Sequence, residues 1–259
     1  MNRFLSSVLA AGMALVMSAG VAAADDQLAR IKQDGVMKIA MSGAYPPFNF
    51  VNDKNEVVGF DASIGREIAR RIGVEGEIVT TAWDGILAGL LAKKYDTIVG
   101  SMTITPEREK VVDFVGPYYH AGRAVFVAEG SDIQSLADIK GKTVGVTLGE
   151  THEKWARTQD GWSVRTYKGL PELLLELQAD RVQAIIADNI PVRVAIKENG
   201  AKLRQLDTPD IEGGSVAIGI AINKKNPELA AAMQAALDEM MADGTYKAIA
   251  MEWVGADIR

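Results

Sequence analysis

The stretch Asp96-Thr-Ile-Val-Gly-Ser-Met-Thr-Ile-Thr-Pro-Glu-Arg108-Glu-Lys-Val-Val-Asp-Phe-Val-Gly-Pro-Tyr-Tyr119 carries the clearest structural pattern in the chain. Its first apolar run, Thr97 to Val99, predicts a buried strand. The small and polar residues from Gly100 to Thr105 predict a loop after that strand. Thr105 suits the N-cap of a helix that has Pro106 at its first position, where the missing N–H costs nothing. The stretch therefore predicts a strand, a loop and a helix start in direct succession.

Arg108 falls in the first turn of this predicted helix. A cation is disfavoured near the positive end of the helix dipole, so its presence there suggests a function. One interpretation is that Arg108 holds an anion beside the free N–H groups of the helix start. The other is that Arg108 is a surface residue paired with Glu107 or Glu109. The local pattern leaves both interpretations open.

Strands and helices alternate before and within this stretch. The predicted strands are Met37–Met41, Glu77–Thr80 and Asp96–Val99, and the predicted helices are Asp61–Ile72, with Asp61 as N-cap, and Asp84–Ala92. Strands separated by such helices imply βαβ units and a parallel sheet. Ligands of these sheets bind beyond the carboxyl ends of the strands. Residues 42–48, 81–83 and 100–105 are therefore expected at one mouth.

A second α/β set follows. Its predicted strands are Val125–Ala128, Lys142–Val146, Ser163–Tyr167 and Val182–Ala187, and its predicted helices are Ile133–Ile139, residues 149–157, Leu170–Gln178 and Ile190–Lys197. An extended run, Val216–Asn223, and two closing helices, Asn226–Ala242 and Thr245–Trp253, complete the chain. Since no flexible linker separates the two sets, extended segments near residues 120–125 and 215–220 suit a two-strand hinge.

The N-terminus has the pattern of a secretory signal peptide over residues 1–24. Arg3 precedes an apolar region, Val8 to Val16, and small residues end at Ala24. No Cys lies at the predicted cleavage site, which excludes a lipid anchor there. We expect export of a mature chain that starts at Asp25.

Composition removes several classes of function. The chain has no Cys, so it has no disulfide, thiol nucleophile or Cys-based metal site. Its two His residues, His120 and His152, lack the spacing of a zinc site. A formal charge of −6 and the lack of a basic aromatic patch argue against nucleic-acid binding. We therefore expect no metal, no cofactor and no nucleic-acid partner.

Seven motifs occur together in a characteristic order. They are Tyr45-Pro-Pro-Phe48, Gly59-Phe-Asp61, Trp83-Asp-Gly-Ile86, Thr103-Ile-Thr-Pro-Glu-Arg108, Asp113-Phe-Val-Gly-Pro-Tyr-Tyr119, Gly141-Lys-x-Val-Gly-Val146 and Asp243-Gly-Thr-Tyr246. With them the chain resembles the periplasmic solute-binding proteins of polar amino acid ABC transporters. The resemblance covers essentially the whole mature chain.

This resemblance implies an α/β, two-lobed periplasmic binding protein fold of type II. Each lobe would be a mainly parallel sheet flanked by helices, and a two-segment hinge would join the lobes. Lobe 1 would comprise residues 25–118 plus 218–259, and lobe 2 residues 119–217. The implied function is that of a monomeric periplasmic component of an ABC uptake transporter. It would bind a free L-amino acid as a zwitterion in the cleft and deliver it to an inner-membrane permease, without catalysis.

The resemblance also implies which residues bind the charged ends of the ligand. Arg108 would bind the α-carboxylate, and the helix start at Thr151 would add an N–H. Asp188 would accept the α-ammonium. Arg fits a carboxylate bidentately, which the point charge of a Lys does not. An open alternative for Asp188 is the N-cap of the helix that follows it.

Four further residues are assigned to the site in the same way. Ser101 and Thr103 would supply backbone groups and a hydroxyl, and Tyr45 and Trp83 would flank the ligand side chain. Three less favoured candidates are Glu150, Asn49 and His152, the last expected to be an exposed helix-surface residue. Family members that prefer cationic amino acids often carry an acid three residues before the Tyr45 position, where this chain has Ser42. This departure disfavours a cationic ligand, although acids elsewhere, Glu150 and Asp84, could substitute for the missing one. A site with flanking aromatic residues and no obvious anion suits a polar, amide-bearing or sulfur-containing side chain.

Alternative functions remain open from the sequence. The ligand could be an opine or another small carboxylate. The family also includes the periplasmic cyclohexadienyl dehydratases, which need a general acid or base in the cleft. The segment Ser215 to Gly219 carries no carboxylate, and Glu212 is the nearest one. An enzyme is therefore disfavoured. Sensing through a separate partner is a third alternative.

Overall fold

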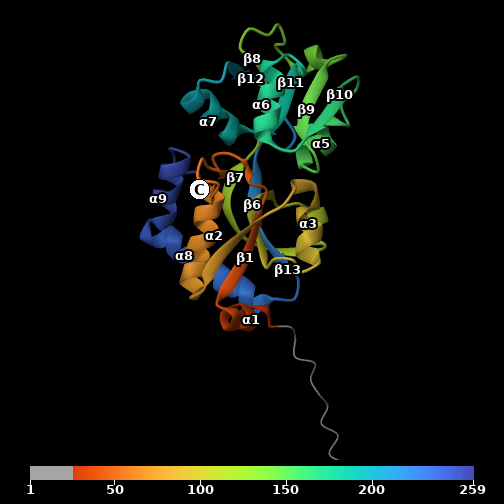
Figure 1. Cartoon of the computed structure of the whole chain (residues 1–259). Coiled ribbons are helices and arrows are strands. Elements are labelled where there is room, and N and C mark those ends of the chain that lie inside the picture. The colour runs from red at the N-terminus through yellow and green to blue at the C-terminus, as the bar shows by residue number, and fades with distance from the viewer. Residues whose placement is uncertain (1–25) are drawn as a thin grey trace, which may run out of the picture.

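The protein consists of two α/β lobes, each built on a five-stranded sheet (Figure 1). The structure, a computed structural model, describes residues 26–259. The predicted signal peptide lies outside these residues. Within them, no helix combines the length and apolar character needed to cross a membrane.

Lobe 1 contains the strand order β5-β1-β6-β13-β7. These strands are β1 Val36–Met41, β5 Glu75–Thr80, β6 Thr97–Thr103, β7 Val112–Ala121 and β13 Val216–Asn223. Its helices are α1 Gln27–Asp34, α2 Phe60–Ile72, α3 Trp83–Leu91, α4 Pro106–Glu109, α8 Pro227–Asp243 and α9 Thr245–Trp253. A small antiparallel sheet joins β2 Ala44–Tyr45, β3 Asn49–Val51 and β4 Val57–Val58.

Lobe 2 contains the strand order β10-β9-β11-β8-β12. These strands are β8 Arg123–Ala128, β9 Thr143–Thr147, β10 Ser163–Tyr167, β11 Ala184–Asp188 and β12 Leu203–Gln205. Its helices are the 3-10 helix η1 Leu136–Ile139, α5 Thr151–Ala156, α6 Leu170–Gln178 and α7 Asn189–Asn199.

One strand of each sheet runs against the other four. In lobe 1 it is β13, antiparallel to β6 and β7. In lobe 2 it is β8, antiparallel to β11 and β12. Each is the first strand after the chain has crossed from the other lobe, so it starts at the cleft and runs away from it. The other strands run toward the cleft, and their carboxyl ends meet there, as the prediction of mainly parallel sheets requires.

Successive side chains of a strand point to opposite faces of the sheet, and in both lobes both of these faces are buried. In β1, Ile39 packs in the cluster that holds Ile68 of α2, whereas Ala40 packs in the cluster that holds Leu90 of α3. In β11, Ile185 packs in the cluster that holds residues of α6, whereas Ile186 packs in the cluster that holds residues of α5. Helices therefore cover both faces of each sheet, which leaves the strand ends at the cleft for polar residues.

Two local predictions are wrong. The expected loop over residues 100–105 is mostly strand, because β6 continues to Thr103 and pairs with β13 at Ile218. Sequence reasoning could not supply this distant partner strand. Asp61 is not an N-cap either, because α2 begins at Phe60 with Gly59 at the N-cap position. The Asp61 carboxylate is instead buried beneath the cleft.

The two segments that cross between the lobes touch each other at Gly122. The Gly122 carbonyl accepts a hydrogen bond from Asn189 N–H (2.8 Å), and Arg123 N–H donates to Gly213 O (2.7 Å). A Cβ atom on residue 122 would lie 1.7 Å from Gly214 O. The crossing therefore leaves no space for a side chain at this position.

We predict that Gly122→Ala destabilises the protein through this contact. Forced overpacking usually costs about 1–3 kcal/mol, and a backbone atom cannot move aside as a side chain can. Chemical denaturation measures the loss. Gly130→Ala is the matched control, since a Cβ there meets nothing within 4 Å. Equal unfolding free energies for the two variants would contradict the prediction.

Candidate functional site

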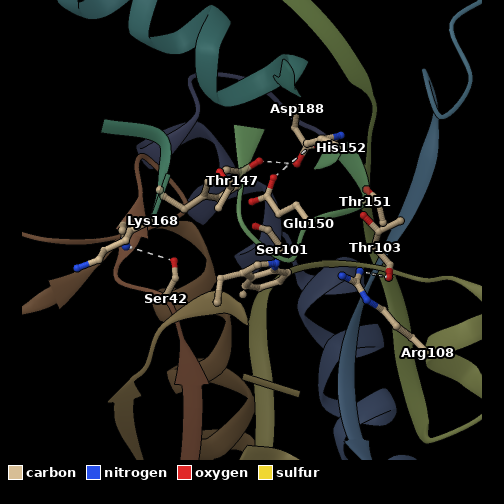
Figure 2. A pocket seen from close by; sticks show the side chains of 15 residues that line it. Ser42, Ser101, Thr103, Arg108, Thr147, Glu150, Thr151, His152, Lys168 and Asp188 are labelled. Carbon is tan, nitrogen blue, oxygen red and sulfur yellow. Dashed lines mark hydrogen bonds and ion pairs between the residues drawn. The ribbon is translucent and has the colours of Figure 1, made fainter. Parts of the chain in front are cut away.

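A cavity lies where the carboxyl ends of the strands from both lobes meet (Figure 2). Its empty volume is about 440 Å³, counted with the part that opens to solvent. The lining residues are Ser42, Ala44, Tyr45, Trp83, Gly100, Ser101, Thr103, Arg108, Thr147, Glu150, Thr151, His152, Lys168, Gly169 and Asp188. The structure thus brings all seven sequence-predicted site residues to one cavity.

Many of the residues that line the cavity lie at or just after the carboxyl end of a strand. Ser42 follows β1, Ser101 and Thr103 end β6, Thr147 ends β9, and Asp188 ends β11. Parallel strands present their carboxyl ends at one edge of a sheet, and the loops there carry the binding groups. The sequence prediction of a shared mouth rests on this rule.

Arg108 is half-buried and faces the cavity from lobe 1. Its Nη1 donates to Thr103 O (2.8 Å), and its guanidinium lies 5.8 Å from the Trp83 ring centroid. Among residues 26–259 no carboxylate lies within salt-bridge distance of it, so the surface pair with Glu107 or Glu109 is not formed. Burial lowers the pKa of Arg108. The guanidinium therefore keeps donors for another anion.

The helix start that positions Arg108 is formed as the sequence predicts. The Thr105 side chain accepts a hydrogen bond from Arg108 N–H (3.2 Å), and Pro106 is the first residue of α4. This N-cap fixes the direction in which Arg108 leaves the backbone. A short, capped helix thereby aims a long side chain.

Asp188 is buried on the lobe 2 side of the cavity. It occupies the N-cap position of α7, yet its side chain makes no capping hydrogen bond. One oxygen accepts a hydrogen bond from the Tyr45 hydroxyl, and the other lies 3.1 Å from His152 Nε2. Burial alone would raise the pKa of Asp188, but His152, Tyr45 and Arg123 together outweigh it and the pKa is lowered. The carboxylate is therefore charged and faces the cavity.

The Tyr45–Asp188 contact also joins the lobes, because Tyr45 belongs to β2 and Asp188 to β11. A second contact lies nearby at Gly169, where a Cβ would be 2.6 Å from Ala44 O. The cleft is thus closed on this side by residues of both lobes.

The prediction that His152 is exposed is wrong. The residue is 4% exposed and lines the cavity between Glu150 and Asp188. A signal for this was present in the sequence: His152, Trp155 and Ala156 have the spacing of one helical face, and all three are buried. Its position beside Thr151 alone could not show which way the side chain points.

Glu150 also lines the cavity, as a second carboxylate from lobe 2. Its Oε2 lies 3.9 Å from His152 Nε2. Burial is the main cause that raises the pKa of Glu150, to about 7. Sequence reasoning ranked Glu150 below the seven principal candidates because a Gly-Glu-Thr loop gives no sign of where the carboxylate points.

Asn49, by contrast, does not line the cavity. It is fully buried and connects two parts of lobe 1. Its Oδ1 accepts hydrogen bonds from Ser42 Oγ and Gly43 N–H (both 2.9 Å), and its Nδ2 donates to Asp61 (2.7 Å). Asn49 therefore supports the cavity wall from behind.

Asp61 is the centre of this supporting network. It is fully buried and accepts hydrogen bonds from the hydroxyls of Tyr118 (2.6 Å) and Ser101 (2.8 Å), besides Asn49. The Tyr118 oxygen in turn accepts from Ser101 N–H (2.9 Å). Ser101 has φ +61°, an uncommon value for a non-glycine residue. The network holds this conformation in the cavity wall.

We predict that Asp61 makes stability depend on pH. Burial raises its pKa from 3.8 to about 6 against the three hydrogen bonds. Its contribution to the unfolding free energy is then fully present below pH 3.8 and is lost as pH rises through 6. The difference between wild type and Asp61→Asn should fall by about 2 kcal/mol between pH 4 and pH 7.

Denaturant titrations across this pH range measure that difference. Asp138→Asn is the control, because hydrogen bonds lower the pKa of the exposed Asp138 and its contribution is lost as pH falls. Its curve should have the opposite slope. A pH-independent difference between wild type and Asp61→Asn would contradict the prediction.

The charged groups of the cavity do not form a metal centre. Among residues 26–259, no group of three or more His, Asp and Glu side chains is arranged to hold a metal ion. The cavity instead combines one guanidinium from lobe 1 with two carboxylates, an imidazole and the Lys168 side chain from lobe 2. Such a set can bind a small molecule that carries both a positive and a negative group.

Comparison with known proteins defines the family. Residues 37–256 match the family of bacterial extracellular solute-binding proteins, family 3. The chain belongs to this family, as the sequence motifs predict. It is 34% identical to the L-cystine-binding protein TcyJ of Escherichia coli, over 98% of this chain and 96% of that protein. It is 32% identical to the L-arginine-binding protein of Pseudomonas aeruginosa, over 87% and 90%.

Solved structures agree with the fold. A mutant of ArgBP from T. maritima superposes with a TM-score of 0.81 at 34% identity, over 88% of this chain and 98% of that chain. An ancestral arginine-binding protein bound to glutamine gives a TM-score of 0.79 at 37% identity, over 85% and 98%. An ancestral amino acid-binding protein, described as a precursor of cyclohexadienyl dehydratase, gives 0.81 at 32% identity, over 88% and 99%. The predicted two-lobed fold is confirmed.

Proposed function

We propose that this protein binds a free L-amino acid as a zwitterion between its lobes and delivers it to an inner-membrane ABC permease. It acts in the periplasm as a monomer, after removal of residues 1–24. The observation that carries the proposal is the meeting of Arg108 from lobe 1 and Asp188 from lobe 2 at one cavity. The cystine- and arginine-binding relatives support the amino acid class of ligand.

The proposed roles follow from the chemistry of the two ends of an amino acid. Arg108 binds the α-carboxylate with its planar donor fork, assisted by the N–H at Thr151. Asp188 accepts the α-ammonium. Ser101 and Thr103 supply polar groups between these ends. Among the described residues no carboxylate forms a salt bridge with the half-buried guanidinium, although Glu150 and Asp188 attract it from a distance.

Side-chain recognition falls to the aromatic residues. Tyr45 is buried with its hydroxyl on Asp188, and Trp83 lies beside Arg108. We propose that both flank the ligand side chain. Tyr and Trp provide an apolar ring surface together with a hydroxyl or an indole N–H that can form a hydrogen bond.

Ligand binding and lobe closure are coupled in this proposal. The opposite charges of the site come from different lobes, so a zwitterion makes both contacts only when the lobes are together. A ligand stabilises whichever state it contacts better, which here is the closed state. We take the hinge to be the two crossing segments, with lobe 1 as residues 25–118 plus 218–259.

A ligand without an amine fits the site less well. An opine retains a secondary amine, but a simple carboxylate offers no donor to Asp188. A buried charge left without its partner costs binding free energy. Calorimetric titration with the standard L-amino acids and L-cystine tests the proposal, and binding of none of them would overturn it.

We propose that the protein has no catalytic activity. Glu150, with a pKa raised to about 7, would be the candidate general acid for a dehydratase. The structural neighbour described as a dehydratase precursor is itself called an amino acid-binding protein, which favours binding for this fold. Turnover of prephenate or arogenate by the purified protein would overturn this part of the proposal.

We predict that Arg108→Ala weakens amino acid binding by about 2–5 kcal/mol, since it removes one partner of a buried charge pair. Calorimetry measures the dissociation constant. Arg157→Ala is the control, because Arg157 is exposed and pairs with Glu153 on the outer face of α5. A loss below about tenfold for Arg108→Ala, about 1.4 kcal/mol, would contradict its role.

A further inference from the structure

Three titratable side chains of lobe 2 gather on one side of the cavity. Figure 2 shows Glu150, His152 and Asp188 close together, with Arg108 apart from them beside Thr103. We call the first three the lobe 2 trio. Among the described residues that line this cavity, Glu150 and Asp188 are the only acids, and lobe 2 adds the cation Lys168. Asp84 and Glu107 of lobe 1 line the adjoining part of the cleft.

His152 occupies the position between the two carboxylates. Its Nε2 lies 3.1 Å from Asp188 Oδ1 and 3.9 Å from Glu150 Oε2. The other oxygen of Asp188 already accepts from the Tyr45 hydroxyl. The imidazole therefore stands where a second cationic group of a ligand would have to lie to reach both acids.

The surroundings of His152 favour its charged form. Charged groups act on it from three places: Asp188 of β11, Glu150 before α5 and Arg123 of β8. Burial lowers the pKa of His152, but the two carboxylates outweigh burial and Arg123, and the pKa is raised. Its Nδ1 has no hydrogen-bond partner among residues 26–259.

The charge of the trio determines which ligand balances it. With His152 as imidazolium the trio carries at most one net negative charge, because burial raises the pKa of Glu150 to about 7, and a single ammonium neutralises it. Without the imidazolium the trio is more negative by one charge, which favours a ligand with a second cationic group. Arg108 requires one carboxylate in either case.

We propose that His152 is the specificity-determining residue of the cleft: it fills the place of a second ligand cation, so the site selects amino acids with uncharged side chains over dibasic ones. This inference rests on the proposed function and adds the ligand's charge class. Lobe 1 presents the uncharged Ser42 hydroxyl to the cavity, which agrees with it. Glutamine bound to an arginine-binding relative indicates that one scaffold can hold either class.

His152→Gln and Glu150→Gln test the proposal in opposite directions. His152→Gln keeps an N–H for Asp188 and removes the charge, whereas Glu150→Gln removes one acid. Calorimetry at pH 7 gives the affinities for L-arginine and for the neutral amino acid that binds wild type most tightly. The readout is the ratio of arginine affinity to neutral affinity, which a general structural defect leaves unchanged because it weakens both ligands.

We expect His152→Gln to raise this ratio by about tenfold or more and Glu150→Gln to lower it. A charge within about 4–6 Å shifts the balance of a neighbouring charge by one to three powers of ten. A ratio in His152→Gln within about threefold of wild type, or wild type that already prefers arginine, would overturn the proposal. If wild type binds no amino acid, the proposed function itself fails, so the two failures are distinguishable.

Discussion

Asp188 is the residue on which the arrangement of the cleft depends. A buried carboxylate is costly unless it has hydrogen-bond or charge partners, and Asp188 obtains them from both sides of the cleft. Tyr45 reaches it from lobe 1, and His152 reaches it from its own lobe. One charge therefore links the two lobes and sets the protonation of the imidazole next to it. The strand β11 must therefore pack its apolar side chains in the core of lobe 2 and also bring Asp188, its last residue, to Tyr45 and His152.

Lobe 1 contains a second buried carboxylate with a different task. Asp61 lies beneath the cavity and is held by hydroxyl and amide groups, and no cation of residues 26–259 contributes to its pKa. Its hydrogen bonds offset the free-energy cost of burying the carboxylate. They also hold Ser101 at its positive φ, which is strained for a non-glycine residue. Through Asn49 the same network reaches Ser42. Both lobes therefore use a buried acid at the strand ends, one to support the wall and one to face the ligand space.

The division between binding and support could not be predicted from residue type. The sequence predicted Asp61 as an N-cap and offered Asn49 as a candidate for contact with the ligand side chain. Short polar side chains near a helix start suit both uses. Each was assigned correctly only when the distances to Ser101, Tyr118 and Ser42 were known. His152 is the converse case, because its helical spacing with Trp155 indicated burial, but not that two carboxylates would meet it.

The sequence by itself determined the alternation of strands and helices, the capped start of α4 that aims Arg108, and the family, because these depend on local periodicity, capping chemistry and motif order. The rule for parallel sheets also placed residues 42–48, 81–83 and 100–105 at one mouth, whereas Arg108, Thr151 and Asp188 were assigned to the site by the resemblance to the family. Only the tertiary structure decided that β6 continues to Thr103, since its partner β13 lies more than a hundred residues further along the chain. Only the tertiary structure placed His152 between Glu150 and Asp188, because the start of α5 and the end of β11 are brought together by the folding of lobe 2.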